Sequence, residues 1–469
     1  MFSTGSAKPG FYLAGCFFLL FASIVFAPVS GHDWQRAAEC LLSLFSFCVI
    51  VSVRTTILGS FVRLTCLIVL ILGTLSAVAS HQPQWAILEL SVLVSCCCMG
   101  SALALQRKKH GCVWDRFLIA FLMFLCALKC LQFFAALTAA LFSGVGILDS
   151  TILFEGFSNR RFYGQFQTFT LALLAFPLMS RRTRPSTKAF ASLLLACWWM
   201  IAIAGGTRGT WLGMVCASVF IFCSCGQWGR RWIGWQLAAA AVGLLLFWCF
   251  FSLLPSYLNI EVTNFAGDRL NASLSARDIL WHQAWDMIKE RPLLGFGPMH
   301  FADIHNVVAA HPHQAILQWA CEWGVPSTLL VMGLAAYGLL ATVKLIRRKA
   351  ASSEPVDLLR ICLLASLTGA LAQSMVDGVI VMPYSQLWLA LVVGWLVGIH
   401  EWSARPAPGG AGMRWGWIAV VMLAVGFLSY VVIRDFPHRG EREDQYAHDF
   451  GGNLQPRFWQ QGVIATTPQ

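Results

Sequence analysis

The sequence contains little charge for its length. Only 12% of its 469 residues are Asp, Glu, Lys or Arg, roughly half the share found in a water-soluble domain. So few charged side chains cannot cover a surface that faces water. In addition, 58% of the residues are hydrophobic and the mean hydropathy is +0.67. The composition therefore excludes a typical water-soluble protein and predicts that lipid is the main solvent.

Several signatures of known chemistry are also missing. The sequence has no P-loop, no Gly-x-Ser-x-Gly nucleophile motif and no Asp-x-Asp pair, which argues against ATP-driven reactions and against metal-bound nucleotide sugars. Its 17 cysteines lie mostly within hydrophobic runs, without the spacing of a disulfide framework or of a Cys–His metal site. The net charge is +11, but no basic stretch is interleaved with aromatic residues, so nucleic acid is not expected as a partner.

Hydrophobic runs of about the length that spans a membrane make up most of the chain. We expect an all-α polytopic transmembrane bundle of about 12–13 spans, without repeats. The expected division is one bundle over residues 1–434, including a helical catalytic segment at 255–325, and a short C-terminal tail at 435–469. The first run is expected to be a retained helix rather than a cleaved signal peptide. The candidate runs are 11–30, 37–53, 62–80, 85–105, 115–142, 162–179, 189–204, 210–226, 232–254, 326–346, 359–376, 382–400 and 415–433.

Lysine and arginine in the loops predict the orientation of the bundle. With the N-terminus in the cytoplasm, six of the eight lysines fall in cytoplasmic loops, whereas Lys129 lies in a helix and Lys289 lies outside. The outer face then carries three segments, 143–161, 205–209 and 255–325. If the thirteenth run spans, the outer face also carries the tail with its Pro-Arg-Phe-Trp sequence at 456–459.

Arginines on the outer face need an explanation, because the positive-inside rule disfavours them there. An ionisable group near membrane depth indicates function by default, and a guanidinium is a bidentate partner for phosphate. The alternative for each is an arginine that reaches toward lipid headgroups. The outer-face arginines are Arg160, Arg161, Arg208, Arg269 and Arg277.

Helix starts are predicted next to two of these arginines. Thr207 can cap the eighth run, which puts Arg208 in its first turn. Residues 275–278, Ser-Ala-Arg-Asp, match a capping box, which puts Arg277 in the first turn of an amphipathic helix. The apolar side of that helix is expected to suit the membrane interface. It consists of Leu280, Trp281, Trp285 and Ile288.

A second short helix is expected to start near His311-Pro312-His313, because proline is favoured at the first helical position. His313 would then lie in the first turn, where the helix dipole disfavours its cationic form and keeps it available as a general base. Helix N-termini also bind anions through backbone N–H groups. Together Arg208, Arg277 and His313 predict a metal-free site for a phosphate diester or pyrophosphate, the alternative being three unrelated polar residues on loops.

Other polar residues of the outer face leave alternatives open. His311 lies two residues from His313, and Asp377 at the end of the eleventh run either orients an arginine or the histidine, or simply faces water at a helix end. A zinc site is a further alternative, although its spacing matches no familiar ligand pattern. Its ligands would be His300, His305, His311 and Asp303.

Three blocks of this sequence resemble the O-antigen ligase family. They are the Gly-Thr-Arg-Gly turn at 206–209, the stretch 277–281 that leads to Arg-Pro-Leu-Leu-Gly-Phe-Gly at 291–297, and the block from His313-Gln314 to Glu-Trp-Gly at 322–324. The resemblance covers residues from about 150 to 400. The superfamily also contains O-antigen polymerases and protein O-oligosaccharyltransferases, and its usual layout of twelve spans with a cytoplasmic C-terminus differs from the thirteen runs found here.

The resemblance implies a GT-C-like, inverting glycosyltransferase that needs no metal or other cofactor. It would transfer a glycan from undecaprenyl pyrophosphate to the lipid A–core oligosaccharide at the periplasmic face of the bacterial inner membrane. Arg208 and Arg277 would hold the pyrophosphate, His313 would deprotonate the acceptor hydroxyl, and Asp377 would support the site. The other expected substrate-binding residues are Arg160, Arg161, Arg269 and His311.

Other functions are compatible with the same pattern. A polymerase or a protein O-oligosaccharyltransferase would use the same donor with another acceptor. A polysaccharide or lipid transporter would also be polytopic, but transporters tend to contain inverted repeats with helices broken at the membrane midplane, and none is evident in this sequence.

Overall fold

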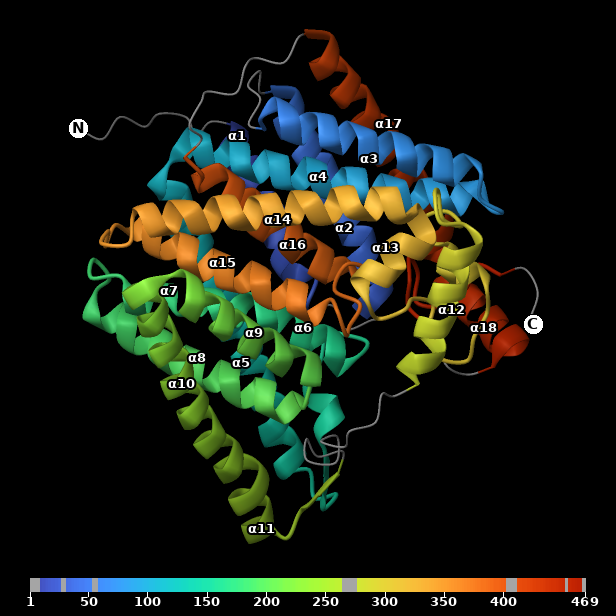
Figure 1. Cartoon of the computed structure of the whole chain (residues 1–469). Helices are drawn as coiled ribbons and strands as arrows, with labels where there is room; N and C mark the ends of the chain where they lie inside the picture. Colours follow the sequence, from blue (N-terminus) through green and yellow to red (C-terminus); the bar gives the residue numbers. More distant parts are fainter. Residues whose placement is uncertain are drawn as a thin grey trace.

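The computed structural model describes residues 9–26, 31–52, 58–263, 276–401, 411–451 and 454–465. These residues are almost entirely helical (Figure 1), so the prediction of an all-α polytopic membrane protein is confirmed. Within the described ranges, nine helices are long and apolar enough to cross a membrane, and three shorter apolar helices lie at Ala14–Ser23, Arg208–Ser224 and Pro383–Ile399.

Each of the thirteen predicted runs coincides with a helix of the structure. The sixth run is α6 with α7, and the ninth, α10, continues through the π-helical turn η2 (Cys249–Leu253) into α11 (Leu254–Leu258). The helices are α1 (Pro9–Ser23), α2 (Gly31–Ser52), α3 (Ser60–Val78), α4 (Pro83–His110), α5 (Cys112–Leu141), α6 (Arg160–Leu174), α7 (Phe176–Met179), α8 (Pro185–Gly205), α9 (Arg208–Ser224), α10 (Gly226–Trp248), α14 (Val325–Arg348), α15 (Pro355–Gln373), α16 (Pro383–Ile399) and α17 (Ala411–Asp435).

Close helix packing holds the centre of the bundle together. α16 packs on α4, and α15 packs on both α9 and α6. Small residues allow this approach, as is common between transmembrane helices. A Cβ atom on Gly394 of α16 would lie 2.4 Å from the carbonyl oxygen of Gly100 in α4, and one on Gly213 of α9 would lie 2.7 Å from the carbonyl oxygen of Gly369 in α15. The helices that carry the site residues are therefore fixed relative to one another.

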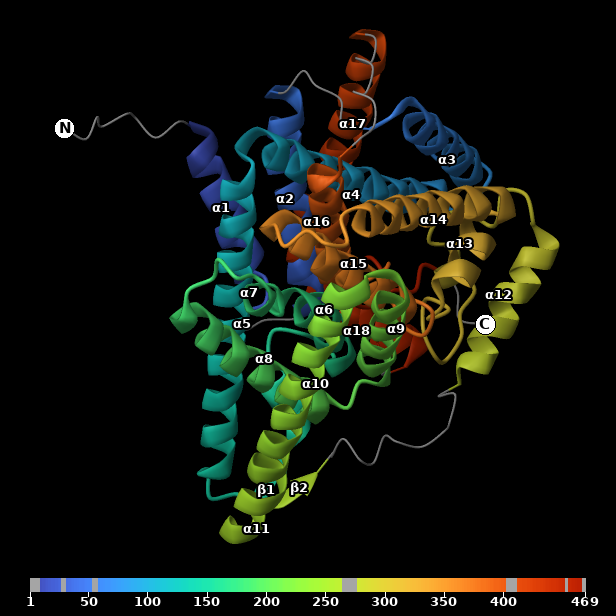
Figure 2. The ribbon, with the colours of Figure 1, turned by 60° about the vertical axis from the view of Figure 1, so that its left-hand side comes forward.

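Several short elements gather at one end of the bundle, which we call the site end. They include α12 (Arg277–Glu290), η4 (His300–Asp303), α13 (Ala315–Trp323), η5 (Phe436–His438) and α18 (Arg439–Phe450), on the right of Figure 1. The strands β1 (Ile147–Asp149) and β2 (Glu261–Thr263) pair in parallel beside η1 (Ser150–Leu153), and lie at the bottom of the view in Figure 2. Basic residues at 107–109 and 347–349, at the ends of α4 and α14, and at 181–184, between α7 and α8, mark the opposite end.

The predicted details of α12 are partly wrong. Arg277 lies in the first turn of the helix, as expected, but the N-cap is Ala276 in a left-handed conformation (φ 58°), so the expected N-cap Ser275, which lies outside the described residues, is one position too early. Trp285 is 53% exposed, because five residues of helix rotate it by about 140° from Leu280. The buried face is Leu280, Ala284, Met287 and Ile288, and it packs against η4 and α13 rather than facing a membrane interface.

Candidate active site

The predicted helix start at Pro312 is wrong. α13 begins at Ala315, because Gln314 occupies the N-cap position and its side-chain oxygen accepts a hydrogen bond from Leu317 N at 2.5 Å. His313 precedes the helix in a left-handed backbone conformation, with φ 55°. For a residue other than glycine this conformation costs about 1–3 kcal/mol and persists only where the surroundings hold it.

Contacts from neighbouring elements hold the loop that carries His313. The indole Nε1 of Trp281 in α12 donates to the carbonyl oxygen of Pro312 at 3.1 Å. The backbone N of Ala315 donates to the carbonyl oxygen of Ser374 at the end of α15, at 2.9 Å. The loop is therefore fixed on one side by α12 and on the other by the α15–α16 connection.

His311 lies behind His313 and supports it. The backbone N of His313 donates to His311 Nδ1 at 3.3 Å, and the two ring centroids are 4.1 Å apart. His311 is buried and packs on Gly378, where a Cβ atom would lie 2.6 Å from the imidazole Cε1. A residue larger than glycine at 378 would displace the ring, so the structure places His311 as a support beneath the loop rather than at its surface.

Three of the predicted arginines form a cationic cluster around this loop. Arg208 is the first residue of α9, Arg277 is the first of α12, and Arg161 is the second of α6. All three are partly buried. Burial lowers the pKa of Arg277, and Arg161 and Arg208 lower it further by repulsion, whereas Asp377 opposes them. With three guanidinium groups and one carboxylate, the net charge of the cluster is +2 (3 − 1). Such a cluster is suited to an anion with two charges.

Asp377 is buried beside Arg161, Arg277 and His313. The sequence had left open whether it orients one of these residues or faces water at a helix end. Its Oδ1 accepts a hydrogen bond from Gly378 N at 2.8 Å, and its Oδ2 accepts one from Gln373 Nε2 at 3.2 Å. Thr168 of α6 in turn donates to Gln373 Oε1 at 2.5 Å, which fixes the amide. Burial raises the pKa of Asp377, while the Gly378 hydrogen bond and Arg161 oppose the rise. The hydrogen bonds from Gly378 and Gln373 therefore fix the orientation of the carboxylate beside the cationic cluster.

The imidazole of His313 faces Asp377 and is neutral. Its Nδ1 lies 3.9 Å from Asp377 Oδ1 and, among the described residues, has no hydrogen-bond partner. Burial, followed by repulsion from Arg161 and Arg277, lowers the pKa of His313 to about 3. A neutral imidazole is what the sequence predicted, but the cause is burial beside two cations rather than a helix dipole, since His313 lies outside α13.

Two other predicted arginines are not placed in this cluster. Arg160 has Asp149 and Arg161 as its charged neighbours, so it lies at the edge of the site toward η1. Arg269 lies outside the described residues.

The described part of the chain contains no ligand set for the alternative zinc site. No three His, Cys, Asp or Glu side chains are placed there to hold a metal ion. His300 uses both ring nitrogens within the protein: Nδ1 donates to the carbonyl oxygen of Pro298 at 3.0 Å, and Nε2 accepts from Gln82 N at 2.9 Å. The side chain of Asp303 bonds to His81 Nδ1 at 2.9 Å.

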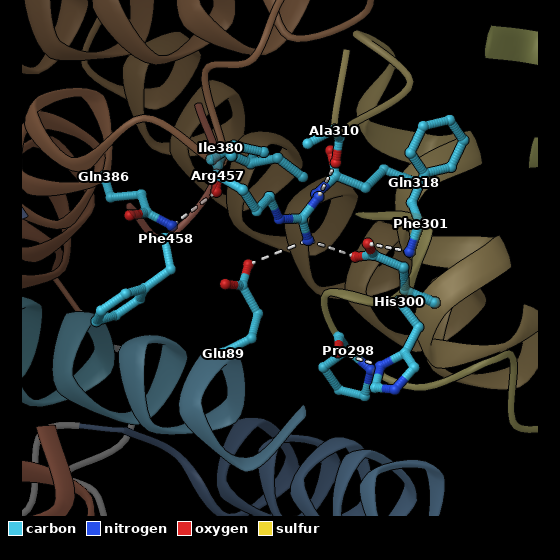
Figure 3. Close-up of polar contacts among 12 residues, drawn as sticks. Glu89, Pro298, His300, Phe301, Ala310, Gln318, Ile380, Gln386, Arg457 and Phe458 are labelled. Carbon is cyan, nitrogen blue, oxygen red and sulfur yellow. Dashed lines mark hydrogen bonds and ion pairs between the residues drawn. The ribbon is translucent and has the colours of Figure 1, made fainter. Parts of the chain in front are cut away.

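A second buried polar group, which was not predicted from the sequence, forms where the C-terminal tail packs beneath the loop of His313. Arg457 is fully buried, and its Nη2 donates to Glu322 Oε2 of α13 at 2.7 Å. Figure 3 shows the guanidinium extending from the tail toward Glu89 of α4 and the carbonyl of Ala310. The available signal was Glu322 itself, because a carboxylate on an apolar helix requires a cationic partner.

Part of this site lies in a segment that is similar to a known family. Residues 190–332 match the family model described as O-antigen ligase. The match runs from α8 into α14, so it includes Arg208, Arg277 and His313, but not Arg161 or Asp377. A search of curated proteins gave no match.

Proposed function

We propose that this chain, a member of the O-antigen ligase family through its residues 190–332, is a glycosyltransferase of GT-C-like, metal-independent type. The proposed donor is a glycan on undecaprenyl pyrophosphate, and the proposed acceptor is a hydroxyl group of the lipid A–core oligosaccharide. The observation that carries the proposal is the neutral imidazole of His313 between cationic Arg161 and Arg277, opposite the buried Asp377.

The proposed reaction uses the charges in the cluster. His313 takes the proton of the acceptor hydroxyl, whose oxygen attacks the anomeric carbon of the donor sugar. The bond from that carbon to the pyrophosphate oxygen breaks, the electron pair leaves with the pyrophosphate, and the configuration inverts. Arg208, Arg277 and Arg161 hold the departing anion and stabilise its growing charge, a contribution that a partly dry site strengthens. Asp377 stabilises the imidazolium that forms.

The proposed orientation puts the site end in the periplasm of a bacterial inner membrane. The basic residues at 107–109, 181–184 and 347–349 lie at the opposite end, which the positive-inside rule assigns to the cytoplasm. Arg160 borders the cluster, and Arg269 lies in the chain between β2 and α12, so both remain proposed substrate-binding residues.

Replacement of the three central residues tests the proposal. We expect Arg208→Ala, Arg277→Ala and His313→Ala each to abolish long glycan on lipopolysaccharide, seen as loss of the ladder on a gel, at normal protein levels. Arg291→Gln is the matched control, because this arginine ends α12 and is 47% exposed. A full ladder in all three variants would contradict the assignment of the site.

Deletion of the gene distinguishes the possible acceptors. Loss of a ligase leaves long glycan on the lipid carrier, whereas loss of a polymerase leaves single repeats attached to the core. Disappearance of glycan from periplasmic proteins would instead indicate transfer to protein. Only the first outcome supports the proposed acceptor.

A further inference from the structure

The C-terminal strap, which we define as residues 454–465, is built into the site end of the bundle. Phe458 and Trp459 are 0% and 1% exposed. The backbone N of Gln460 donates to Asp33 Oδ1 at the start of α2, at 2.7 Å. The backbone N of Ile464 donates to the carbonyl oxygen of Ala302 in η4, at 3.0 Å. The strap therefore joins the N-terminal helices to the segment that leads to His313.

Arg457 of the strap contacts the chain on both sides of the loop 311–314. Before the loop, its Nη1 lies 3.5 Å from the carbonyl oxygen of Ala310. After the loop, its Nη2 bonds to Glu322 of α13 at 2.7 Å. When the amide of Gln318 in α13 is turned so that its oxygen faces the guanidinium, this oxygen accepts from both Nη atoms at 3.0 and 3.2 Å. One guanidinium thus fixes the distance between the two ends of the loop.

The position of Arg457 is in turn set from the opposite side. Arg36 of α2 donates from Nη2 to the carbonyl oxygens of Arg457, at 3.3 Å, and of Val381 before α16, at 2.9 Å. The Nε2 of His32 donates to the carbonyl oxygen of Arg457 at 3.1 Å. The backbone of Arg457 is therefore anchored to α2 and to the α15–α16 connection, independently of α13.

Stability alone does not account for this arrangement. Replacing a buried ion pair with apolar side chains of similar size is often neutral or stabilising, so a buried pair such as Arg457–Glu322 is weak evidence for a role in stability. His313, in contrast, occupies a left-handed conformation that must be imposed by its surroundings. A planar guanidinium with several fixed donors suits the task of holding two chain segments at once.

We propose that Arg457 is a positioning residue, which acts through Ala310 and α13 to hold the His313 imidazole against Arg161, Arg277 and Asp377. This inference rests on the proposed function, because it concerns the geometry of the proposed base. It adds a residue that lies outside the matched range 190–332 and that touches neither substrate nor reacting atoms.

The first experiment measures access to His313 without any substrate. Purified full-length protein is treated with diethyl pyrocarbonate, and modification of each histidine is followed by mass spectrometry. The His313 side chain is 12% exposed, whereas His110 at the opposite end of the bundle is exposed and serves as internal reference. We expect Arg457→Gln to speed modification of His313 several-fold relative to His110. An unchanged ratio would overturn the inference even if the protein proves not to be a transferase.

The second experiment separates positioning from substrate binding. In a transfer assay with purified donor and acceptor, Arg457→Gln is expected to lower kcat on the order of 10- to 100-fold, because small displacements of a catalytic group have effects of this size. The KM for the donor should stay within about threefold, since no donor contact is lost. A raised KM with unchanged kcat, or a kcat within about twofold of the wild type, would overturn the inference. Failure of the wild type to transfer glycan at all would refute the proposed function instead. The first experiment would then be the test of whether Arg457 positions His313.

Control variants address folding. Arg439→Gln removes an arginine that lies over the ring of Phe436 in the adjoining segment, and should change neither readout. If Arg457→Gln accumulates poorly, the double variant Arg457→Gln with Glu322→Gln avoids leaving one buried charge without its partner. The double variant should show the same faster modification of His313 and the same loss of kcat. Wild-type values for the double variant would overturn the proposal.

Discussion

Replacing Arg277 with Gln distinguishes a substrate-binding arginine from a structural one. Arg277 is half-buried, and its charged neighbours are Arg161 and Arg208, which repel it, and Asp377, which attracts it. One net like-charge pair near a partly exposed surface is worth on the order of 1 kcal/mol or less. We therefore expect Arg277→Gln to leave the free energy of unfolding unchanged or to raise it by up to about 1 kcal/mol.

The same substitution should weaken binding of a diphosphate. Inorganic pyrophosphate at a hundred times its Kd should stabilise the wild type by about 2.7 kcal/mol. Loss of one charge-assisted contact costs about 1.5–3 kcal/mol, which is roughly 10- to 100-fold in Kd. At the same pyrophosphate concentration, Arg277→Gln should then gain only about 0.4–1.4 kcal/mol. Transfer should fall about 100- to 1000-fold, as when one donor to a developing anion is removed.

Thermal unfolding of the purified protein in detergent measures these changes, with tryptophan fluorescence as the signal, because the chain has 20 tryptophans. Melting curves with and without pyrophosphate are compared for the wild type, Arg277→Gln and the exposed control Arg291→Gln. The reasoning is refuted if Arg277→Gln lowers the melting temperature by several degrees, because Arg277 would then stabilise the fold. It is equally refuted if pyrophosphate stabilises Arg277→Gln as much as the wild type.

Three further outcomes are expected. The pKa of His313 is lowered to about 3 by burial and by Arg161 and Arg277, so the imidazole stays neutral until the pH falls to that value. The rate at which diethyl pyrocarbonate modifies His313 should therefore not fall near pH 6.5, and such a fall would contradict this. Arg161→Gln, which removes one repelling cation, should move the fall in that rate to higher pH. Gly213→Ala should cost about 1–3 kcal/mol of unfolding free energy, because its Cβ would lie 2.7 Å from the oxygen of Gly369, whereas Gly338→Ala in α14 meets no atom within 4 Å and should be neutral or stabilising in the same melting assay. Treatment with EDTA should leave transfer unchanged, and a loss restored by zinc would revive the metal alternative.

The bundle was predictable from the sequence because the signal for a membrane span is local. A run of about 20 apolar residues is sufficient evidence of a spanning helix, and each of the thirteen runs lies on a helix. The partial exception is α6, which is among neither the nine long apolar helices nor the three shorter ones of the described residues. Its Gln165, Gln167, Thr168 and Thr170 are all buried, so polar side chains replace apolar ones where the helix faces the interior below the site.

The site was predictable only where local rules decide the structure. Arg208 and Arg277 lie in first helical turns, as their flanking residues suggested. The preference for proline at the first helical position gave the wrong helix start near His313, because the side chain of Gln314 caps α13 instead. The pairing of Arg457 with Glu322 could not be predicted from the sequence, because the two residues are 135 positions apart. Contacts over such distances depend on the packing of the whole bundle rather than on any local pattern.

The strap also has a consequence for the order of folding. Its contacts include α2, α4, η4 and α13, all of which precede it in the chain. During synthesis those helices are complete while residues 454–465 are still to be added, and until then Glu322 lacks its cation and His313 lacks one of its restraints. On the proposed role of Arg457, correct placement of His313 is therefore a late event. A polypeptide stalled shortly after α17 would contain every residue of the cationic cluster without the contact that holds the imidazole against it.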